Sequence, residues 1–328
     1  MGTFNNRYVA LKKESAYGTP GGSYAFGEVD DESIKHSYDL LTREDMSRYG
    51  ASKSVTGKEY SSGDVNMAML NDNFTANLID GIMGTNVVSG SGPYTHTFTE
   101  AGTLDSYTLL VSRESKEHLY KGMVVESMSV SANLNEYATV GFSFMGQSEA
   151  IGSIAAVGTT SPNFSDGLPA LYFSNAKVFF NADATASSMV KSISFDINLN
   201  RDDENACALG STTYTIAPPA QRREVSGTIE FNIVPYAAVE NEPTYNTLVA
   251  ADGVEFAGSG VELKVQFGDD STANLMAFNF YKIRFEAPEA NVSGRDTNTM
   301  SVGFTGLYSS NDNKMMDIVM INGQSGTY

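Results

Sequence analysis

The sequence contains no tryptophan and only one cysteine, Cys207. A single cysteine cannot form an intrachain disulfide, and its place among alanines is typical of a small structural side chain rather than of a nucleophile. No run of roughly 18 apolar residues occurs, so we expect no transmembrane helix. The first residues lack the apolar segment of a signal peptide, and we expect a chain made in a cytoplasm-like compartment.

Positive charge is also scarce. Lys and Arg number 21 against 39 Asp and Glu, which gives a formal net charge of −18. Proteins that bind nucleic acid by neutralising phosphates need the opposite balance, so this binding mode is excluded. Only 18% of the residues are charged and 30 are glycines, a composition typical of a protein rich in strands and turns.

Enzymatic motifs are absent as well. The sequence has no GxxxxGK[ST], no strand-linked GxGxxG, no GxSxG and no HExxH. His36, His96 and His118 lie in unrelated segments without a Cys or a carboxylate at ligand spacing. Choosing two of the many acids as a glycosidase pair would be arbitrary. We therefore predict a non-enzymatic protein with no catalytic residues, no cofactor and no metal.

One charged phrase occurs twice, as LLTREDMSRYG at 40–50 and INLNRDDENACALG at 197–210. The matched residues are Leu41, Arg43, Glu44, Asp45 and Gly50 in the first copy and Leu199, Arg201, Asp202, Asp203 and Gly210 in the second. Four further matches follow in the same order: a Val-Thr/Ser-Gly triplet, a helix-like segment, an apolar strand and a Gly-Phe phrase. They lie at 55–57 and 225–227, 71–84 and 241–253, 106–115 and 260–270, and 138–146 and 299–307.

Five matches in one order predict a tandem duplication of a domain. The segment 146–167 between the copies is rich in Gly, Ser and Thr, which is typical of a linker or a long surface crossing. We therefore place one domain at 1–155 and the second at 156–328.

Within each half, apolar and polar residues alternate with the period of a β-strand. In KSISFDINLN, Ile193, Phe195 and Ile197 point one way, while Ser194 and Asp196 point the other. EVSGTIEFNIV and ESMSVSANL alternate in the same way, so each sheet has one apolar face and one face of hydroxyls, amides and a few carboxylates. The fold class predicted is mainly β, with two tandem β-sandwich or half-barrel domains, each with one short flanking helix.

KKESAYGTP at 12–20, the V[ST]G strand followed by a short helix, and LYKGMVVESMSVSANLNEYATVGFSFMG at 119–146 resemble the tail tube (major tail) proteins of long-tailed bacteriophages. The resemblance covers nearly the whole chain, in two copies. It implies tube domains that close into a β-barrel ring around a lumen, with a long loop that reaches the next ring. Many relatives have one domain per chain and form hexameric rings. Two domains per chain therefore imply a homotrimeric ring with pseudo-sixfold symmetry.

The resemblance also implies the location and the partners of the protein. The chain would polymerise with itself into the virion tail, in the host cytoplasm, and serve as the conduit for DNA ejection. DNA and the tape measure protein would pass through the lumen without tight binding, tail terminator and baseplate proteins would lie at the ends, and no membrane would be involved. Two other classes stay open: another structural virion protein, such as a capsid decoration or baseplate hub component, and an enzyme or carbohydrate-binding β-sandwich. The lack of tryptophan argues against the last.

By position, the loops at 40–54 and 199–224 match the loop that reaches the next ring. The residues expected at this inter-ring contact are Arg43, Glu44, Asp45, Arg201, Asp202 and Asp203. The residues expected to line the lumen are Ser192, Ser194, Asp196, Asn198, Ser226, Thr228, Glu230 and Asn232, with Ser37, Asp39, Thr56 and Lys58 in the first half. The alternative is that these polar faces point to the outer solvent.

Overall fold

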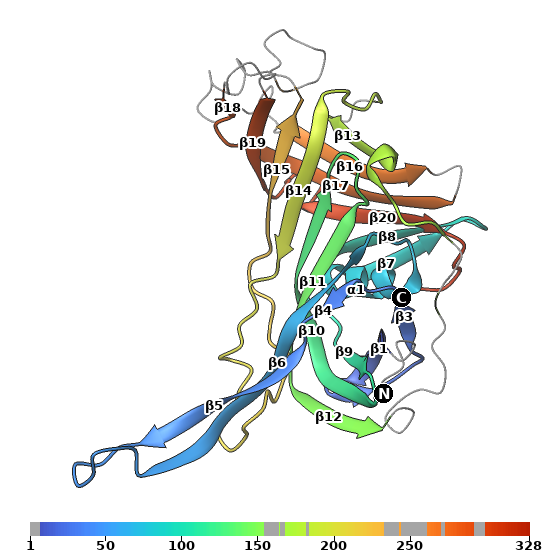
Figure 1. Ribbon diagram of the computed structural model, residues 1–328. Coiled ribbons are helices and arrows are strands. Elements are labelled where there is room, and N and C mark those ends of the chain that lie inside the picture. Colours follow the sequence, from blue (N-terminus) through green and yellow to red (C-terminus); the bar gives the residue numbers. More distant parts are fainter. Residues whose placement is uncertain are drawn as a thin grey trace.

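The computed structural model describes residues 7–153, 164, 168–181, 184–232, 243, 261–269, 273–291 and 299–328. Within these ranges the chain is mainly β, with a single α-helix, as expected for the predicted β-sandwich (Figure 1). The second predicted helix, at 241–253, falls outside the described residues except for residue 243. Among the helical segments described, none has the length and apolar character needed to span a membrane.

The elements fall into two groups along the chain. The first group comprises β1 (Tyr8–Ala16), β2 (Thr19–Pro20), β3 (Ala25–Gly27), β4 (Asp31–Glu32), β5 (Lys35–Arg43), β6 (Lys53–Ala68), α1 (Asn73–Met83), β7 (Gly84–Ser89), β8 (Tyr94–Glu100), β9 (Tyr107–Arg113), β10 (Lys116–Ala132), β11 (Thr139–Gly146) and β12 (Ser148–Ser153). The second comprises the 3-10 helix η2 (Phe173–Asn175), β13 (Ala176–Phe180), β14 (Val190–Asn198), β15 (Glu224–Phe231), β16 (Val261–Asp269), β17 (Asn274–Phe285), β18 (Glu289–Asn291), β19 (Thr299–Gly306) and β20 (Met316–Asn322).

One antiparallel sheet runs through both groups, and we call it the long sheet. Its strands pair in the order β4/β5, β6, β11, β10, β14, β15 and β19, and the end of β17 and then β18 pair along the far edge of β19. The pairing of β10 with β14 joins the two groups in the middle of the sheet. β4 and β5 at one side and the end of β17 at the other have no strand partner on their outer edges in the described part of the chain. The long sheet is therefore open within one chain.

Two shorter sheets back the long sheet. In the first group the order is β3, β1, β9, the first part of β10, and β12. In the second group it is β13, β16, β17, β20, β8 and β7, so the β7–β8 hairpin of the first group completes the sheet of the second. β10 and β17 each belong to a backing sheet and to the long sheet. Because buried residues from both groups form one hydrophobic cluster, the two groups share a core.

The strand pairings recur from one group to the other. In the long sheet, β6 and β11 are followed by β10 in the first group, and β15 and β19 are followed by the end of β17 in the second. Phe142 pairs with Val65 and Met128, and Phe304 pairs with Gly227 and Phe285. The Gly-Phe phrases at 138–146 and 299–307 therefore occupy matching positions.

The register corrects one sequence match. The triplets at 55–57 and 225–227 do not occupy equivalent positions, because Gly227 lies opposite Phe304 in the body of the sheet, whereas residues 55–56 pair with Leu41 and Leu40 far out on β5. A three-residue phrase is too short to set register when β6 has sixteen residues. The position that corresponds to Gly227 is Val65.

Helix α1 lies where the apolar spacing predicts it. Phe74, Leu78, Ile79 and Ile82 are fully buried against the core. The Asp72 carboxylate accepts the Thr75 N–H at 2.8 Å and caps the first turn. Gly84 ends the helix at φ 96°, a conformation in which a side chain would be strained.

Candidate assembly surfaces

The exposed face of the long sheet is polar, as the alternation predicts. In β14, Ile193, Phe195 and Ile197 are at most 3% exposed, while Ser194 and Asp196 are exposed on the other face. β15 continues the pattern, because Ser194 pairs with Thr228 and Asp196 with Ser226. The structure thus brings the second-half residues expected at the lumen onto one surface, which we call the polar face: Ser192, Ser194, Asp196, Asn198, Ser226, Thr228 and Glu230, with Asn232 exposed just beyond β15.

In the first half, other residues carry the polar face than those expected. Ser37 pairs with Tyr60 and Asp39 lies at an irregularity of β5, where the hairpin leaves the sheet. Thr56 lies further out, opposite Leu40, and Lys58 is used in an ion pair described below. The residues that continue the polar face are Asp64, Asn66, Ser127, Ser129, Ser131 and Ser143.

The alternation at 126–134 could have identified the serines of β10, and the alternation of Asp64, Val65, Asn66 and Met67 could have identified Asp64 and Asn66. In the structure Ser143 donates to Asp64 at 2.6 Å and Asn66 donates to Asp31 at 2.8 Å. These bonds tie the Asp64 carboxylate to a neighbouring hydroxyl and the Asp31 carboxylate to a neighbouring amide.

The β5–β6 hairpin extends far beyond the body of the molecule, and we call residues 37–60 the arm (Figure 1). Leu40, Leu41 and Val55 are 58–62% exposed, and Met46 and Tyr49 near the tip are fully exposed. Leu40 and Leu41 are consecutive in a strand, so apolar side chains are open on both faces of the arm. An exposed apolar cluster of this kind marks a contact surface rather than a solvated loop.

Arg43 and its neighbours lie at the outer end of the arm, with Arg43 as the last residue of β5. Its side chain is exposed and its carbonyl accepts the Ser52 N–H at 2.8 Å. Hydrogen bonds from Ser47 lower the pKa of the Asp45 carboxyl, so Asp45 is charged at neutral pH. Arg43, Glu44 and Asp45 are therefore available to another molecule.

Arg201, by contrast, is bound inside its own chain. Its Nε donates to the Val125 carbonyl at 2.6 Å and its Nη1 to the Pro218 carbonyl at 2.7 Å. Burial lowers the pKa of Arg201 to about 10, which leaves the guanidinium charged at neutral pH. The two sequence-matched arginines thus have different surroundings.

The acids of the second loop also have partners within the chain. Asp202 accepts the Asn205 N–H and the Gln221 amide, both at 3.1 Å. Asp203 forms an ion pair with Lys58 at 2.5 Å, and the Glu59 N–H donates to the Thr212 carbonyl at 2.7 Å. These contacts hold the segment 199–223 along the base of the arm.

This difference between the arginines predicts different effects on stability. Arg201→Ala should lower the free energy of unfolding by about 1–3 kcal/mol, because two carbonyls lose their donors in a largely buried site. Arg43→Ala, the matched control on the exposed arm, should change it by less than about 0.5 kcal/mol. Urea titrations of both variants measure this, and equal losses would contradict the assignment.

Comparison with protein families identifies one that covers most of the chain. The family described as phage tail tube protein matches residues 5–306, which include the arm, the long sheet, the first backing sheet and all of the second backing sheet except β20. Comparison with curated proteins gives no significant match. Since the family match extends over far more than half of the sequence, the chain belongs to the phage tail tube protein family.

Proposed function

We propose that this chain polymerises into stacked rings that form the tail tube of a long-tailed phage, the conduit through which DNA is ejected. The family is a structural one rather than an enzymatic one, and its members are virion components. The observation that carries the proposal is the long sheet, whose polar face crosses both halves and whose two edges are open. Closing such a sheet between chains removes both edges.

The proposal includes a duplicated tube domain, with copies at 1–155 and 156–328. The recurrence of strand order and of the Gly-Phe register in the long sheet supports this. Three chains would then supply six similar domains to a ring with pseudo-sixfold symmetry. The mass of an isolated ring tests the number, because six chains per ring would overturn the trimer.

In this ring the polar face lines the lumen. Lysines or arginines on the wall would bind DNA phosphates and hold the duplex, whereas hydroxyls, amides and carboxylates let it pass. Asp64, Asp196 and Glu230 are carboxylates of this face, and Lys191 near its border is paired with Glu230 at 2.7 Å. Over a Debye length of roughly 8 Å, such carboxylates repel the duplex from the wall.

Charge reversal on the polar face should slow DNA ejection. Asp196→Lys and Glu230→Lys together place two cations per chain on the wall, and both positions are at the sheet surface, so tubes should still assemble. Ejection from virions that carry this variant should slow at low salt and recover as salt is raised. Lys substitution at Thr185, away from the sheet, is the control. Unchanged ejection at low salt would place the polar face elsewhere than the lumen.

The arm is proposed to reach the next ring. Its apolar residues would be buried there, and Arg43 could pair in a fork with a carboxylate of the neighbouring ring. Arg201, Asp202 and Asp203 would act less directly, by shaping the segment 199–223 that packs along the base of the arm. Within that segment Leu209 is fully exposed, so it is the side chain best placed for a second contact.

Electron microscopy of the purified protein tests the proposal as a whole. A tube protein gives rings or polytubes at high concentration, and DNA and a tape measure protein would occupy the lumen in the virion, with terminator and baseplate proteins at the ends. A capsid decoration or baseplate component would instead stay monomeric or form a single closed oligomer. Absence of rings and tubes from the purified chain and from virions would overturn the tube assignment.

A further inference from the structure

At the junction between the two groups, the last long-sheet strand of the first group, β10, meets the first long-sheet strand of the second group, β14. There β10 pairs antiparallel with β14, with Ser129 opposite Asp196 and Met128 opposite Ile197. The groove beside this junction is small, about 90 Å³, and is lined by Ala132 at the end of β10 and by Asn133 and Leu134 just beyond it. The two open edges of the chain carry the counterparts of these two strands: β4–β5 corresponds to β14, and the end of β17 corresponds to β10.

At the first open edge, the backbone of Ile34 points away from the sheet. The Ser33 N–H donates to the Asp64 carbonyl at 2.9 Å. The backbone polar groups of Ser33 therefore point to β6, and those of Ile34 point away from it. The Glu32 carboxylate accepts the Ile34 N–H at 3.0 Å, and the Tyr120 hydroxyl, at 3.1 Å, and the Arg113 guanidinium both donate to the Ile34 carbonyl. Side chains of the same chain therefore occupy the two backbone groups that a neighbouring strand would bind.

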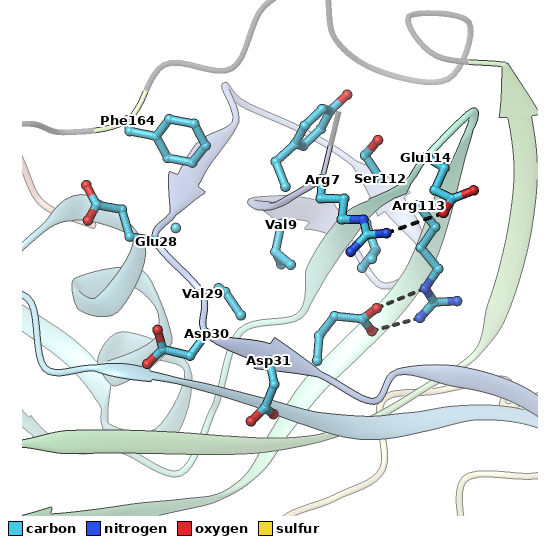
Figure 2. A pocket seen from close by; sticks show the side chains of 14 residues that line it. Arg7, Val9, Glu28, Val29, Asp30, Asp31, Ser112, Arg113, Glu114 and Phe164 are labelled. Carbon is cyan, nitrogen blue, oxygen red and sulfur yellow. Dashed lines mark hydrogen bonds and ion pairs between the residues drawn. The ribbon is translucent and has the colours of Figure 1, made fainter. Parts of the chain in front are cut away.

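A groove of about 800 Å³ lies beside this edge (Figure 2). Val9, Val29 and Phe164 line it, with acids such as Glu28 and Asp31 at its border. It corresponds in position to the small groove at the internal junction. Val9 of β1 lines the larger groove, and Ala176, which has the matching position in β13 of the second group, lines the small one. In the described part of the chain, none of the residues that line the larger groove comes from a strand end like that of β10.

At the second open edge, Glu286 occupies the position that Ser129 has at the internal junction. Ser129 lies opposite Gly141, and the Glu286 N–H donates to the Gly303 carbonyl at 2.8 Å. Both glycines precede the phenylalanine of the Gly-Phe phrase. Glu286 thus faces its own β19, and Phe285 points its backbone outward.

The register of β6 and β15 also gives the residue of the first open edge that corresponds to Asp196. Asn66 lies opposite Gly141 and Thr228 opposite Gly303, so β6 and β15 are in matching register. Four residues before these positions, Ser62 pairs with Lys35 and Glu224 pairs with Asn198. Lys35 therefore corresponds to Asn198, and Ser33, two residues earlier, corresponds to Asp196.

We propose that the end of β17 pairs antiparallel with the β4–β5 edge of the next chain, with Glu286 opposite Ser33 and Phe285 opposite Ile34, and that β18, which continues this edge along β19, lies beside the 800 Å³ groove. This register rests on the proposed ring of identical chains. Phe285 and Ile34 then form the hydrogen-bonded pair that Met128 and Ile197 form internally, and the bonds of Glu32, Tyr120 and Arg113 to Ile34 are replaced by it. Lys35 lies diagonal to Glu286, which places an opposite charge within reach of the carboxylate.

A disulfide tests the register directly. Ser33 and Glu286 would be a non-hydrogen-bonded pair, with Cα atoms about 4.5 Å apart, a spacing that a disulfide can bridge. In a Cys207→Ala background, Ser33→Cys combined with Glu286→Cys should cross-link assembled rings or tubes under oxidation into closed covalent trimers. Chains carrying only one of the two cysteines, when mixed before assembly, should give covalent dimers and nothing larger.

Two controls separate the possible results. Ser129→Cys with Asp196→Cys, the internal pair, should cross-link within one chain and shows that oxidation works. Asp31→Cys with Glu286→Cys, shifted by two residues on the same face, should cross-link at least tenfold less. If tubes form but only the shifted pair cross-links, or neither does, the register is overturned while the tube function stands. If the unmodified chain forms neither rings nor tubes, the proposed function fails and the interface with it.

Discussion

Replacing Leu40, Leu41 and Val55 with serine is expected to give a folded, soluble chain that no longer forms tubes. These side chains are about 60% exposed on the arm and contribute nothing to the core of the free chain. Burying a leucine against another molecule contributes about 1.5–3 kcal/mol. A loss of about 3 kcal/mol per chain raises the concentration needed for assembly roughly 100-fold, and this loss is repeated at each chain of a ring.

Sedimentation and electron microscopy measure the loss of tubes, and circular dichroism checks the fold. Val87→Ser is the matched control, because Val87 is 56% exposed but lies in β7, away from the arm. Arg43→Glu should weaken assembly further, and Asp45→Lys should partly restore it if Arg43 and Asp45 pair between rings. Normal tubes from the triple serine variant would show that the arm does not hold rings together.

Phe195→Ala is expected to produce the largest loss of stability. Phe195 is 1% exposed and joins the long sheet to the backing sheet of the second group, with ring centroids 5.1 Å from Phe278 and 5.2 Å from Phe280. Removing a buried phenylalanine leaves a cavity and costs about 3–5 kcal/mol. The urea midpoint should fall accordingly.

Ser194→Ala, at the neighbouring position on the polar face, should change the free energy of unfolding by less than about 0.5 kcal/mol. The pair of variants tests which face of β14 is buried in the free chain. A similar loss from both would contradict the alternation on which the polar face depends.

The alternation in β14 and β15 could be read from the sequence because it is local. Successive side chains of a strand point to opposite faces, so Ile193, Phe195 and Ile197 had to share the apolar face whatever the strand pairs with. Helix α1 was accessible for the same reason, since its spacing, its cap at Asp72 and its closing Gly84 lie within a dozen residues. The family resemblance, drawn from such local phrases, is confirmed by the family match.

Strand pairing was not accessible in this way. Residues 53–60 carry few apolar side chains, which fits an exposed strand, but the sequence does not show that this part of β6 leaves the sheet and forms the arm with β5. The lumen residues expected in the first half, Ser37 and Asp39, were placed by analogy with the second half, and the hairpin there begins to leave the sheet.

By itself, the sequence determined the β class, the apolar and polar faces of individual strands, the helix at 73–83 and the family, all of which depend on neighbours in the chain. Only the tertiary structure decided what the two similar loops do. Arg43 and Arg201 follow the same local pattern, yet Arg201 binds the carbonyl of Val125, 76 residues away, while Arg43 is left on an exposed arm. A guanidinium binds whatever acceptors the folded backbone brings to it, and those acceptors are set by the pairing of strands distant in sequence.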